Sequence, residues 1–355
     1  MKIIDSLGYS VIFDNQFDSL NQFLKERSYS KVFILTDRNT GEQCLPLLVA
    51  DMPSDFKYDI IEVDPGEENK NIDFCIGIWK MLLDFGADRN SLLINLGGGV
   101  VTDMGGFAAS TFKRGIDFVQ MPTTLLSQVD ASVGGKTGID MDSVKNIIGT
   151  FTQPKAVFIN SDFLKTLSKR QLISGYAEMI KHAFIFDADY FRDVKEIDFD
   201  HIDEELIYRS VGIKNKVVTQ DPKEQGLRKI LNFGHTIGHA VETYSLEKDA
   251  RPLLHGEAIA VGMICEAYLS NQYNGLGEGQ LTEVVEAIRK TFPDYNLKAE
   301  SFDTLIQIMR NDKKNDDDKI GFALLTKIGH CDFNHYLDAD KIKSALTYYQ
   351  ETIGS

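Results

Sequence analysis

The chain has 355 residues, which is long enough for about two domains. It carries 38 lysine and arginine residues against 53 aspartate and glutamate residues, so its formal net charge is −15. This acidic balance argues against a general nucleic-acid binder and against a binder of anionic membranes, because both depend on positive charge. We find no apolar run of the ~18–20 residues that span a bilayer, no signal-peptide core and no CxxC pair among the four cysteines. We therefore expect a cytoplasmic protein with reduced cysteines and no membrane or nucleic-acid partner.

The first half of the chain alternates short apolar runs with helical patterns. The apolar runs predict strands at 31–37, 58–63, 91–96, 118–121 and 156–159. Helical periodicity lies between them at 17–27, 72–85 and 101–112. Buried strands that alternate with helices predict βαβ units and a mostly parallel sheet.

The second half changes character. Long helical patterns cover 169–186, 203–219, 231–244, 256–273, 278–291 and 301–310, and only 321–326 looks like a strand. We therefore expect an α/β domain over residues 1–166 and an α-helical domain over residues 167–355.

A glycine triplet follows one of the predicted strands. A strand enters Gly97, Gly98 and Gly99, and a helix follows. Glycine lets backbone N–H groups approach a phosphate closely, and a new helix offers its positive end to an anion. The spacing is not GxGxxG, so both a nucleotide pyrophosphate site and a simple tight turn stay open. Thr123 and Thr124 follow the next strand and would reach the same edge of a parallel sheet.

A second glycine-rich stretch, at residues 134–138, resembles the end of a phosphate-binding P-loop. The upstream glycine of that motif falls at Asp130, so we do not expect a P-loop nucleotidase. A flexible glycine loop that presents Lys136, with Lys145 and Asn146 nearby, would still form an anion cradle in this acidic chain.

The histidines give a stronger signal. His235 and His239 are one helical turn apart and share a helix face, and His255 opens a later helix. Imidazole nitrogens suit zinc or cobalt, and two histidines with a carboxylate are a frequent ligand set. An upstream helix offers Glu178, on one face with Lys181. Histidines that cap helix ends are the alternative explanation.

Basic residues accompany these histidines. They are Lys214, Arg228, Lys313 and Lys314. Each one alone is typical of a solvated surface charge, but together with Lys136 and Lys145 they predict a substrate with more than one anionic group.

At this point the motifs resemble one family. The strings are GGGVVTDMGGFAASTFKRG (97–115), QMPTTLLSQVDASVGGKTGID (120–140), KNIIGTF (145–151), GYAEMIKHA (175–183), LRKILNFGHTIGHA (227–240) and LLHGEAIAVGM (253–263). Over about residues 30–330 the chain resembles the 3-dehydroquinate synthases, sugar-phosphate cyclases of the shikimate pathway. The resemblance implies an N-terminal Rossmann-like NAD domain, a C-terminal all-α domain, an active site in the interdomain cleft and a homodimer.

The resemblance also implies roles for individual residues. The implied ligands of a Zn²⁺ (or Co²⁺) ion are Glu178, His235 and His255. The implied NAD contacts are Asp37, Glu67, Lys70, Gly98, Gly99, Asp103, Thr123, Thr124, Lys136, Lys145, Phe163 and Thr166. The implied catalytic and substrate-binding residues are Asp130, Lys136, Asn146, Lys181, Lys214, Arg228, Asn232, His239 and one of Lys313 and Lys314. Arg114 would reach the substrate phosphate of the neighbouring subunit.

The implied substrate is 3-deoxy-D-arabino-heptulosonate 7-phosphate. The implied reaction oxidises C5 with NAD⁺, eliminates phosphate, reduces C5 again, opens the ring and closes a carbocycle by an intramolecular aldol reaction. A sister cyclase acting on sedoheptulose 7-phosphate or glucose 6-phosphate, a metal-dependent polyol dehydrogenase and a non-catalytic NAD- or metal-binding regulator are the alternatives. Arg228, Asn232 and His239 match the dehydroquinate synthase pattern and favour 3-dehydroquinate synthase over these alternatives. The charged stretch 247–251 before His255 suggests a longer loop there.

Overall fold

The computed structural model describes residues 1–53, 56–141, 144–312 and 319–354. The chain forms two compact units, Met1–Ser168 and Lys169–Ser355. Within the described ranges, no helix combines the length and the apolar character that crossing a bilayer requires. The cysteines Cys44, Cys75, Cys265 and Cys331 are all free and buried.

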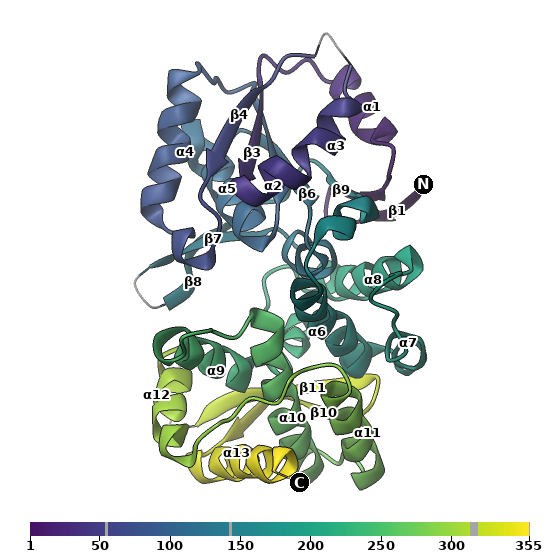
Figure 1. Cartoon of the computed structure of the whole chain (residues 1–355), viewed down its shortest axis with the longest axis vertical. Helices are drawn as coiled ribbons and strands as arrows, with labels where there is room; N and C mark the ends of the chain where they lie inside the picture. The colour runs from purple at the N-terminus through teal and green to yellow at the C-terminus, as the bar shows by residue number, and fades with distance from the viewer. Residues whose placement is uncertain (54–55, 142–143, 313–318, 355) are drawn as a thin grey trace. The chain divides into compact units, whose positions relative to one another are not determined.

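The first unit is built on a seven-stranded sheet (Figure 1). Its strands are β1 (Lys2–Asp5), β2 (Ser10–Phe13), β3 (Val32–Asp37), β4 (Asp59–Val63), β5 (Leu92–Gly97), β6 (Asp117–Pro122) and β9 (Val157–Ile159). The order is β1-β2-β9-β6-β5-β3-β4, with β1 antiparallel to β2 and all other neighbours parallel. The five strands predicted from apolar runs are β3, β4, β5, β6 and β9, which form the parallel part of the sheet together with β2. β1 and β2 were not predicted, because they are short and each has residues that are not fully buried.

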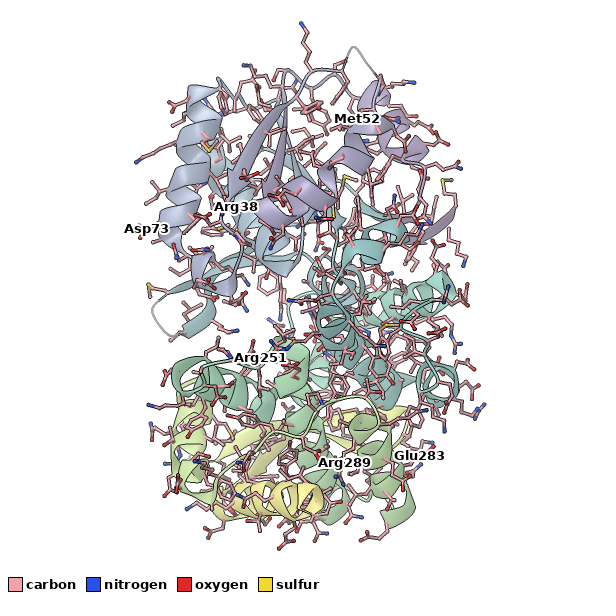
Figure 2. All side chains as sticks on the ribbon, in the orientation of Figure 1. Arg38, Met52, Asp73, Arg251, Glu283 and Arg289 are labelled. Atoms are coloured by element: carbon pink, nitrogen blue, oxygen red, sulfur yellow. The ribbon has the colours of Figure 1, made fainter. Side chains whose placement is uncertain are left out.

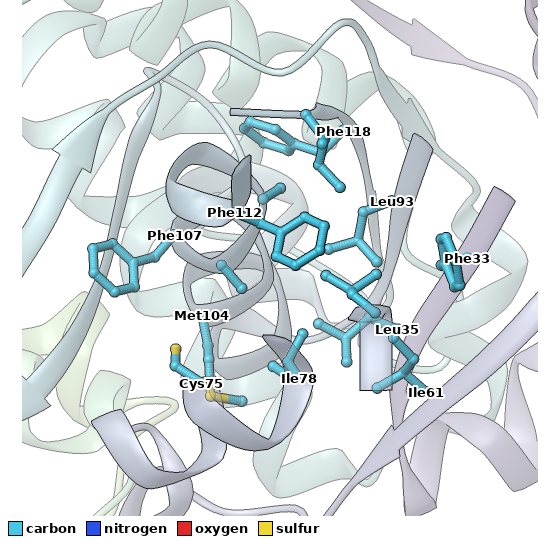
Figure 3. Close-up of a cluster of buried hydrophobic side chains, with 14 of the residues drawn as sticks. Phe33, Leu35, Ile61, Cys75, Ile78, Leu93, Met104, Phe107, Phe112 and Phe118 are labelled. Atoms are coloured by element: carbon cyan, nitrogen blue, oxygen red, sulfur yellow. The ribbon is translucent and has the colours of Figure 1, made fainter. Parts of the chain in front are cut away.

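Helices cover both faces of this sheet. They are α1 (Asp18–Glu26), α2 (Arg38–Gln43), α3 (Leu45–Ala50), α4 (Ile72–Asp84) and α5 (Gly99–Thr111). One apolar cluster joins α4 and α5 to the strands and includes Leu35, Ile78, Leu93 and Met104 (Figure 3). A second cluster joins α1 and α3 to the other face. Burial on both faces explains why β3 and β5 have nearly uninterrupted apolar sequences.

Short polar contacts fix the ends of these elements. The Asp37 carboxylate accepts a hydrogen bond from the backbone N–H of Thr40 and caps α2. Arg38, the first residue of α2, pairs with Asp64 after β4 at 2.6 Å (Figure 2). A separate hairpin, β7 (Lys136–Met141) with β8 (Val144–Phe151), packs against α5.

The second unit is largely helical. Its helices are α6 (Lys169–Phe186), α7 (Ala188–Val194), α8 (Glu204–Gln220), α9 (His235–Lys248), α10 (His255–Tyr273), α11 (Glu278–Arg289), α12 (Phe302–Asp312) and α13 (Ala339–Ile353). The expectation of an all-α unit needs one correction, because β10 (Ile320–Lys327) and β11 (His330–Leu337) form an antiparallel pair. The apolar run at 321–326 predicted β10. β11 was not predicted, because its polar and apolar residues alternate too irregularly.

The core of this unit is α10. Its residues from Gly256 to Ala267 are all buried, and it packs against α6, α9, α11, α13 and β10. A helix that is apolar on all sides is typical of a central core position. The helices that pack on it therefore take their positions from it.

Candidate functional site

The residues expected to contact a dinucleotide follow the carboxyl ends of the parallel strands. Asp37 ends β3, Glu67 and Lys70 follow β4, Gly98, Gly99 and Asp103 follow β5, Thr123 and Thr124 follow β6, and Phe163 and Thr166 follow β9. Parallel strands put all these ends at one edge of the sheet. The strand order reverses between β3 and β5, and an open α/β sheet binds its ligand in the crevice at such a point. Asp37 and the glycine triplet lie on either side of it.

The glycine triplet makes a close turn from β5 into α5. A Cβ on Gly97 would lie 2.5 Å from the Cβ of Val101, so Gly97 is required by packing. Gly98 is the N-cap of α5 and provides no side-chain cap, so the first N–H groups of this helix have no partner inside it. The Thr123 hydroxyl beside this turn is buried and has no hydrogen-bond partner among the described residues. Open backbone donors and an unused hydroxyl fit a phosphate group.

The two later glycines of the same motif serve packing. A Cβ on Gly105 would lie 2.1 Å from Oδ1 of Asn95, and one on Gly106 would lie 2.5 Å from Cγ2 of Thr137. Asn95 Nδ2 donates to Oε1 of Gln120 at 3.0 Å, so a buried amide pair joins β5 and β6 beneath α5. These glycines let α5 lie directly on the sheet and on the β7–β8 hairpin.

A buried lysine joins three segments next to this turn. Lys70 is 3% exposed, and its Nζ donates to Oδ2 of Asp103 at 2.7 Å and to Oδ1 of Asn146 at 2.6 Å. Burial alone would lower the pKa of Lys70, but the carboxylates of Asp103 and Glu67 outweigh burial and raise it. Lys70 therefore stays charged and holds α5 and the hairpin together.

The β7–β8 hairpin corrects one prediction. The stretch around Lys136 was expected to be a flexible glycine loop, but Lys136 begins strand β7 and its partner in β8 is Phe151. Gly134 and Gly135, which have positive φ, precede the strand and make the turn. Asn146 also has a positive φ of 52°, and its backbone N–H donates to Oδ1 of Asp140 at 2.6 Å.

Four further residues of the expected set lie elsewhere in this unit. Lys145 is 3.5 Å from Oε1 of Glu67, and Asp130 lies in a helical turn at Ser127–Ala131. Phe163 is buried against Phe17, so it supports the apolar core as well as the edge of the sheet. Arg114 is exposed and has a φ of 72°, in a turn that presents its side chain outward.

The expected metal ligands come together in the second unit. Glu178 on α6 is fully buried, and its Oε1 lies 3.4 Å from Nε2 of His235 and 3.7 Å from Nε2 of His255. The ligand atoms of all three residues lie within 4.8 Å of one another. Zinc with nitrogen and oxygen ligands at about 2.1 Å needs ligand atoms roughly 3.4 Å apart in tetrahedral geometry. The donor set and its spacing therefore fit a divalent cation.

The charges around Glu178 act differently on the two histidines. Burial and the ammonium of Lys181 hold the pKa of His235 well below its usual range, so its imidazole is neutral and can donate a lone pair. Burial also disfavours the charged form of His255, but Glu242 and Glu178 outweigh it and raise the pKa of His255 to about 10. A divalent cation would compete with that proton.

Glycines and one carboxylate fix the helix that carries two of the histidines. The helix predicted over 231–244 begins only at His235, because Gly234 has a φ of 79°. A Cβ on Gly262 of α10 would lie 1.9 Å from the carbonyl oxygen of Gly234, so α9 and α10 touch backbone to backbone. The buried Glu266 accepts hydrogen bonds from the N–H groups of Gly234 at 2.7 Å and Ile237 at 3.0 Å. This cap sets the direction of α9.

Sequence reasoning missed Glu242. It lies on α9, two turns after His235, and is 5% exposed, with Oε2 3.3 Å from Nδ1 of His255. A carboxylate on the outer nitrogen of a metal-binding imidazole fixes its tautomer and direction. His239, Glu242 and His255 also form a second possible ligand group. The i, i+3 spacing of His239 and Glu242 was the available signal.

Three of the expected cationic residues of this unit, Lys181, Lys214 and Arg228, are buried. Lys181 contacts Oε2 of Glu178 and is 1% exposed, and Lys214 on α8 is 5% exposed. Arg228 is 3% exposed, and its Nη1 donates to the carbonyl oxygen of Pro222 at 2.8 Å. Asn232 Nδ2 donates to Oε1 of Glu224 at 2.8 Å. Lys313 and Lys314 lie outside the described residues.

The segment before His255 is short and well held. α9 continues to Lys248, so the expected long loop is reduced to residues 249–254. Asp249 accepts hydrogen bonds from Ser245 Oγ at 2.6 Å and Tyr295 Oη at 2.9 Å. The backbone N–H of Leu253 donates to Ser245 Oγ at 2.9 Å. The position of His255 is thus determined from both sides of the loop.

Comparison with known proteins agrees with this arrangement. Residues 60–174 match the family model described as 3-dehydroquinate synthase N-terminal, and residues 175–315 match 3-dehydroquinate synthase C-terminal. The 3-dehydroquinate synthase of Parabacteroides distasonis is 46% identical over 94% of this chain and 96% of its own. That of a Sulfurovum species (strain NBC37-1) is 39% identical over 97% of each chain.

Solved structures of other cyclases share the fold. A 2-deoxy-scyllo-inosose synthase complexed with carbaglucose-6-phosphate, NAD⁺ and Co²⁺ has a TM-score of 0.85 at 23% identity, covering 99% of each chain. A 2-epi-5-epi-valiolone synthase from Streptomyces hygroscopicus, with NAD⁺ and Zn²⁺ bound, has a TM-score of 0.82 at 24% identity and the same coverage. These likenesses establish the fold, and the matches at higher identity establish the family. The chain belongs to the 3-dehydroquinate synthase family.

Proposed function

We propose that the chain converts 3-deoxy-D-arabino-heptulosonate 7-phosphate to 3-dehydroquinate and phosphate, with NAD⁺ and a zinc or cobalt ion as cofactors. The observation that carries the proposal is 46% identity, over nearly the whole chain, to a protein named for this activity. The spacing of Glu178, His235 and His255 supports it independently, because a metal-dependent reaction needs such a donor set.

Each unit would contribute one part of the chemistry. When bound, NAD⁺ supplies a hydride acceptor that is reduced and then reoxidised, and the divalent cation supplies positive charge beside the substrate hydroxyl groups. The open N–H groups at the start of α5 and the Thr123 hydroxyl would bind the dinucleotide phosphates. Glu178, His235 and His255 would hold the cation.

The buried cations of the second unit suit a substrate that carries a carboxylate and a phosphate. Arg228 is fixed by the carbonyl of Pro222, so its guanidinium loses little freedom when it binds a carboxylate. Lys181 and Lys214 add two buried ammonium groups. In a chain of net charge −15, such a local set of cations is what allows a doubly anionic substrate to bind.

Proton transfer would also involve these side chains. The rings of His239 and His235 have centroids 5.0 Å apart, so the His239 imidazole lies close to the expected metal ligands. We assign His239 the task of assisting the transfer of the C6 proton to the departing phosphate. Asn146 accepts a hydrogen bond from Lys70 through its Oδ1, and its Nδ2 donors would then serve the substrate.

The proposal extends to a cytoplasmic homodimer. The exposed Arg114 would contact the substrate phosphate of the neighbouring subunit. Arg114→Ala should therefore lower the activity of the dimer. Mixing it with a Lys181→Ala variant should restore part of the activity, because in a mixed dimer one site has both an intact Lys181 and an intact Arg114. Sedimentation of the purified chain tests the dimer itself.

The direct test of the function is phosphate release from the heptulosonate phosphate with catalytic NAD⁺ and Zn²⁺, before and after addition of a chelator. Turnover that is sensitive to chelator and produces no net NADH is expected. Release only from sedoheptulose 7-phosphate would indicate a sister cyclase, and net NADH formation would indicate a polyol dehydrogenase.

A further inference from the structure

An ion pair joins the first turns of the two helices that carry Glu178 and His255. Arg170, in the first turn of α6, donates from Nε to Oε1 of Glu257 at 2.7 Å and from Nη2 to Oε2 at 2.6 Å. Glu257 lies in the first turn of α10, and its side chain is 6% exposed. Two parallel charge-assisted hydrogen bonds fix both distance and orientation, which a lysine in place of the arginine could not do.

The same two side chains hold the backbone just before His255. Arg170 Nη2 also donates to the carbonyl oxygen of Pro252 at 2.7 Å. The N–H of Leu254 donates to Oε2 of Glu257 at 2.8 Å, which closes the first turn of α10. The chain therefore enters α10 in one direction, and this direction determines where the imidazole of His255 lies.

Direct backbone contact between α6 and α10 makes the position of His255 depend on the direction in which the chain enters α10. The N–H of Gly256 donates to Oγ of Ser174 at 3.0 Å, and a Cβ on Gly256 would lie 2.0 Å from the carbonyl oxygen of Ser174. α6 and α10 thus touch between the ion pair and the ligands. Any opening of the first turn of α10 would move His255 away from Glu178, to which it now lies at 3.7 Å.

We infer that Arg170 and Glu257 are positioning residues that hold His255 at the distance from Glu178 that a divalent cation requires. The inference rests on the metal site of the proposed function. It concerns neither substrate nor hydride transfer, because neither side chain is part of the ligand set. Replacing a residue that orients a metal ligand usually lowers metal affinity by 10- to 100-fold.

The test compares the zinc affinity of the unchanged protein with that of Arg170→Lys, by competition with a chromophoric chelator. We expect the zinc dissociation constant to rise roughly 10- to 100-fold, while the affinity for NAD⁺ stays unchanged. Excess zinc should restore phosphate release, because the ligands themselves remain. Arg170→Met, which also removes the charge, should weaken zinc at least as much.

Arg289→Lys is the matched control. Arg289 ends α11 of the same unit (Figure 2) and pairs with Asp294 at 3.4 Å, and neither residue is among the expected ligands. This variant should bind zinc as the unchanged protein does. Thermal unfolding separates positioning from plain stabilisation: the Arg170 variants should lose mainly the increment that zinc adds, whereas a structural ion pair would lower the midpoint equally with and without zinc.

Equal zinc affinities of the unchanged protein, Arg170→Lys and Arg170→Met would overturn the inference, even if phosphate release from the heptulosonate phosphate proceeds as proposed. Conversely, weakened zinc binding in both variants supports the inference even if the unchanged protein acts on another sugar phosphate. A chain that binds no zinc or cobalt at all overturns both the inference and the metal site.

Discussion

Each of the two units contains a buried lysine beside a carboxylate, but the other side chains around the two pairs differ. In the first unit, Lys70 bonds to Asp103 and Asn146, so its charge is matched by neighbours from α5 and the hairpin. In the second unit, Lys181 contacts Glu178, and His235 and His255 also face that carboxylate. In the first cluster, the charge of the lysine is balanced by residues of the same unit, so no bound ion is needed. In the second cluster, a lysine and two imidazoles surround a single carboxylate.

This difference indicates how each unit would hold the cofactor that we propose for it. The first offers fixed backbone donors at the start of α5, and its ion pair serves to keep the surrounding segments in place. The second offers side chains whose mutual distances suit a cation, and a bound cation would join α6, α9 and α10. We therefore expect changes in the first cluster to affect the fold and NAD⁺ together, and changes in the second to affect the metal first.

The largest effect should come from His235→Ala. The change removes one of the expected nitrogen ligands, so zinc affinity should fall by at least about a thousandfold and phosphate release should become undetectable. NAD⁺ affinity should stay unchanged. His201→Ala is the control, because the His201 side chain is 89% exposed. Full activity with stoichiometric zinc in His235→Ala would show that His235 is not a ligand.

Lys70→Met should produce the opposite pattern. It leaves the Asp103 carboxylate partly buried without its lysine, so the free energy of unfolding of the first unit should fall by about 3 kcal/mol. NAD⁺ binding should weaken and zinc affinity should not change. Urea unfolding and separate NAD⁺ and zinc titrations measure these quantities, with the exposed Lys80→Met as control.

The pH dependence of that effect has a definite sign. The folded-state pKa of Lys70 is raised, so its contribution to stability is fully present below the unfolded-state value of about 10.4 and is lost above it. The difference in unfolding free energy between the unchanged protein and Lys70→Met should therefore be constant from about pH 6 to 9. A difference that already shrinks between pH 7 and 8 would mean that Lys70 is not held by Asp103 as described.

Arg228→Ala should have a smaller and more selective effect. The backbone N–H of Arg228 donates to Asp221 at 3.0 Å, and this contact survives the change, so the local turn should stay in place. Loss of one charge-assisted contact should raise the KM for the carboxylate-bearing substrate roughly 10- to 100-fold, with little change in NAD⁺ affinity. Equal losses for substrate and NAD⁺ would indicate that Arg228 has a structural role.

Apolar patterning was enough to predict the strands that are buried on both faces. β3 and β5 are nearly uninterrupted apolar runs, because helices cover each side of them. The hairpin β7–β8 was not predicted, since Gly138 and Gly149 face each other across it and its sequence looks like a loop. There the strand depends on tertiary contact with α5, which sequence periodicity does not contain.

The site shows the same division. Helical spacing was sufficient to put His235 and His239 on one face, and their rings lie 5.0 Å apart. Spacing could not show that Glu242 faces His255, or that Glu257 pairs with Arg170, because these pairs are set by how α6, α9 and α10 pack. A charged residue on a helix is usually solvated, so burial is the information that the sequence lacked.

The smallest expected effect is a change in the rate at which buried cysteines react, and it tests the contrast between the two units. Burial and the Asp37 carboxylate raise the pKa of Cys44 to about 11, and burial raises the pKa of Cys75 to about 12. At pH 8 only about 0.1% of Cys44 would be thiolate, and its reactivity should rise about tenfold per pH unit up to pH 11. Cys265 lies on α10, ten residues after His255, and burial raises its pKa as well. All three thiols should therefore react slowly with a thiol reagent in the zinc-loaded protein.

Removal of zinc should separate them. If the cation joins α6, α9 and α10, chelation loosens the start of α10 and should speed labelling of Cys265 by about threefold or more, through local opening. Cys44 and Cys75 belong to the first unit, whose Lys70 cluster needs no cation to balance its charges, so their labelling rates should not change. Mass spectrometry of the labelled peptides measures the three rates separately. Equal acceleration of all three would mean that the metal stabilises the whole chain, and that the contrast between a complete first cluster and a metal-dependent second one is wrong.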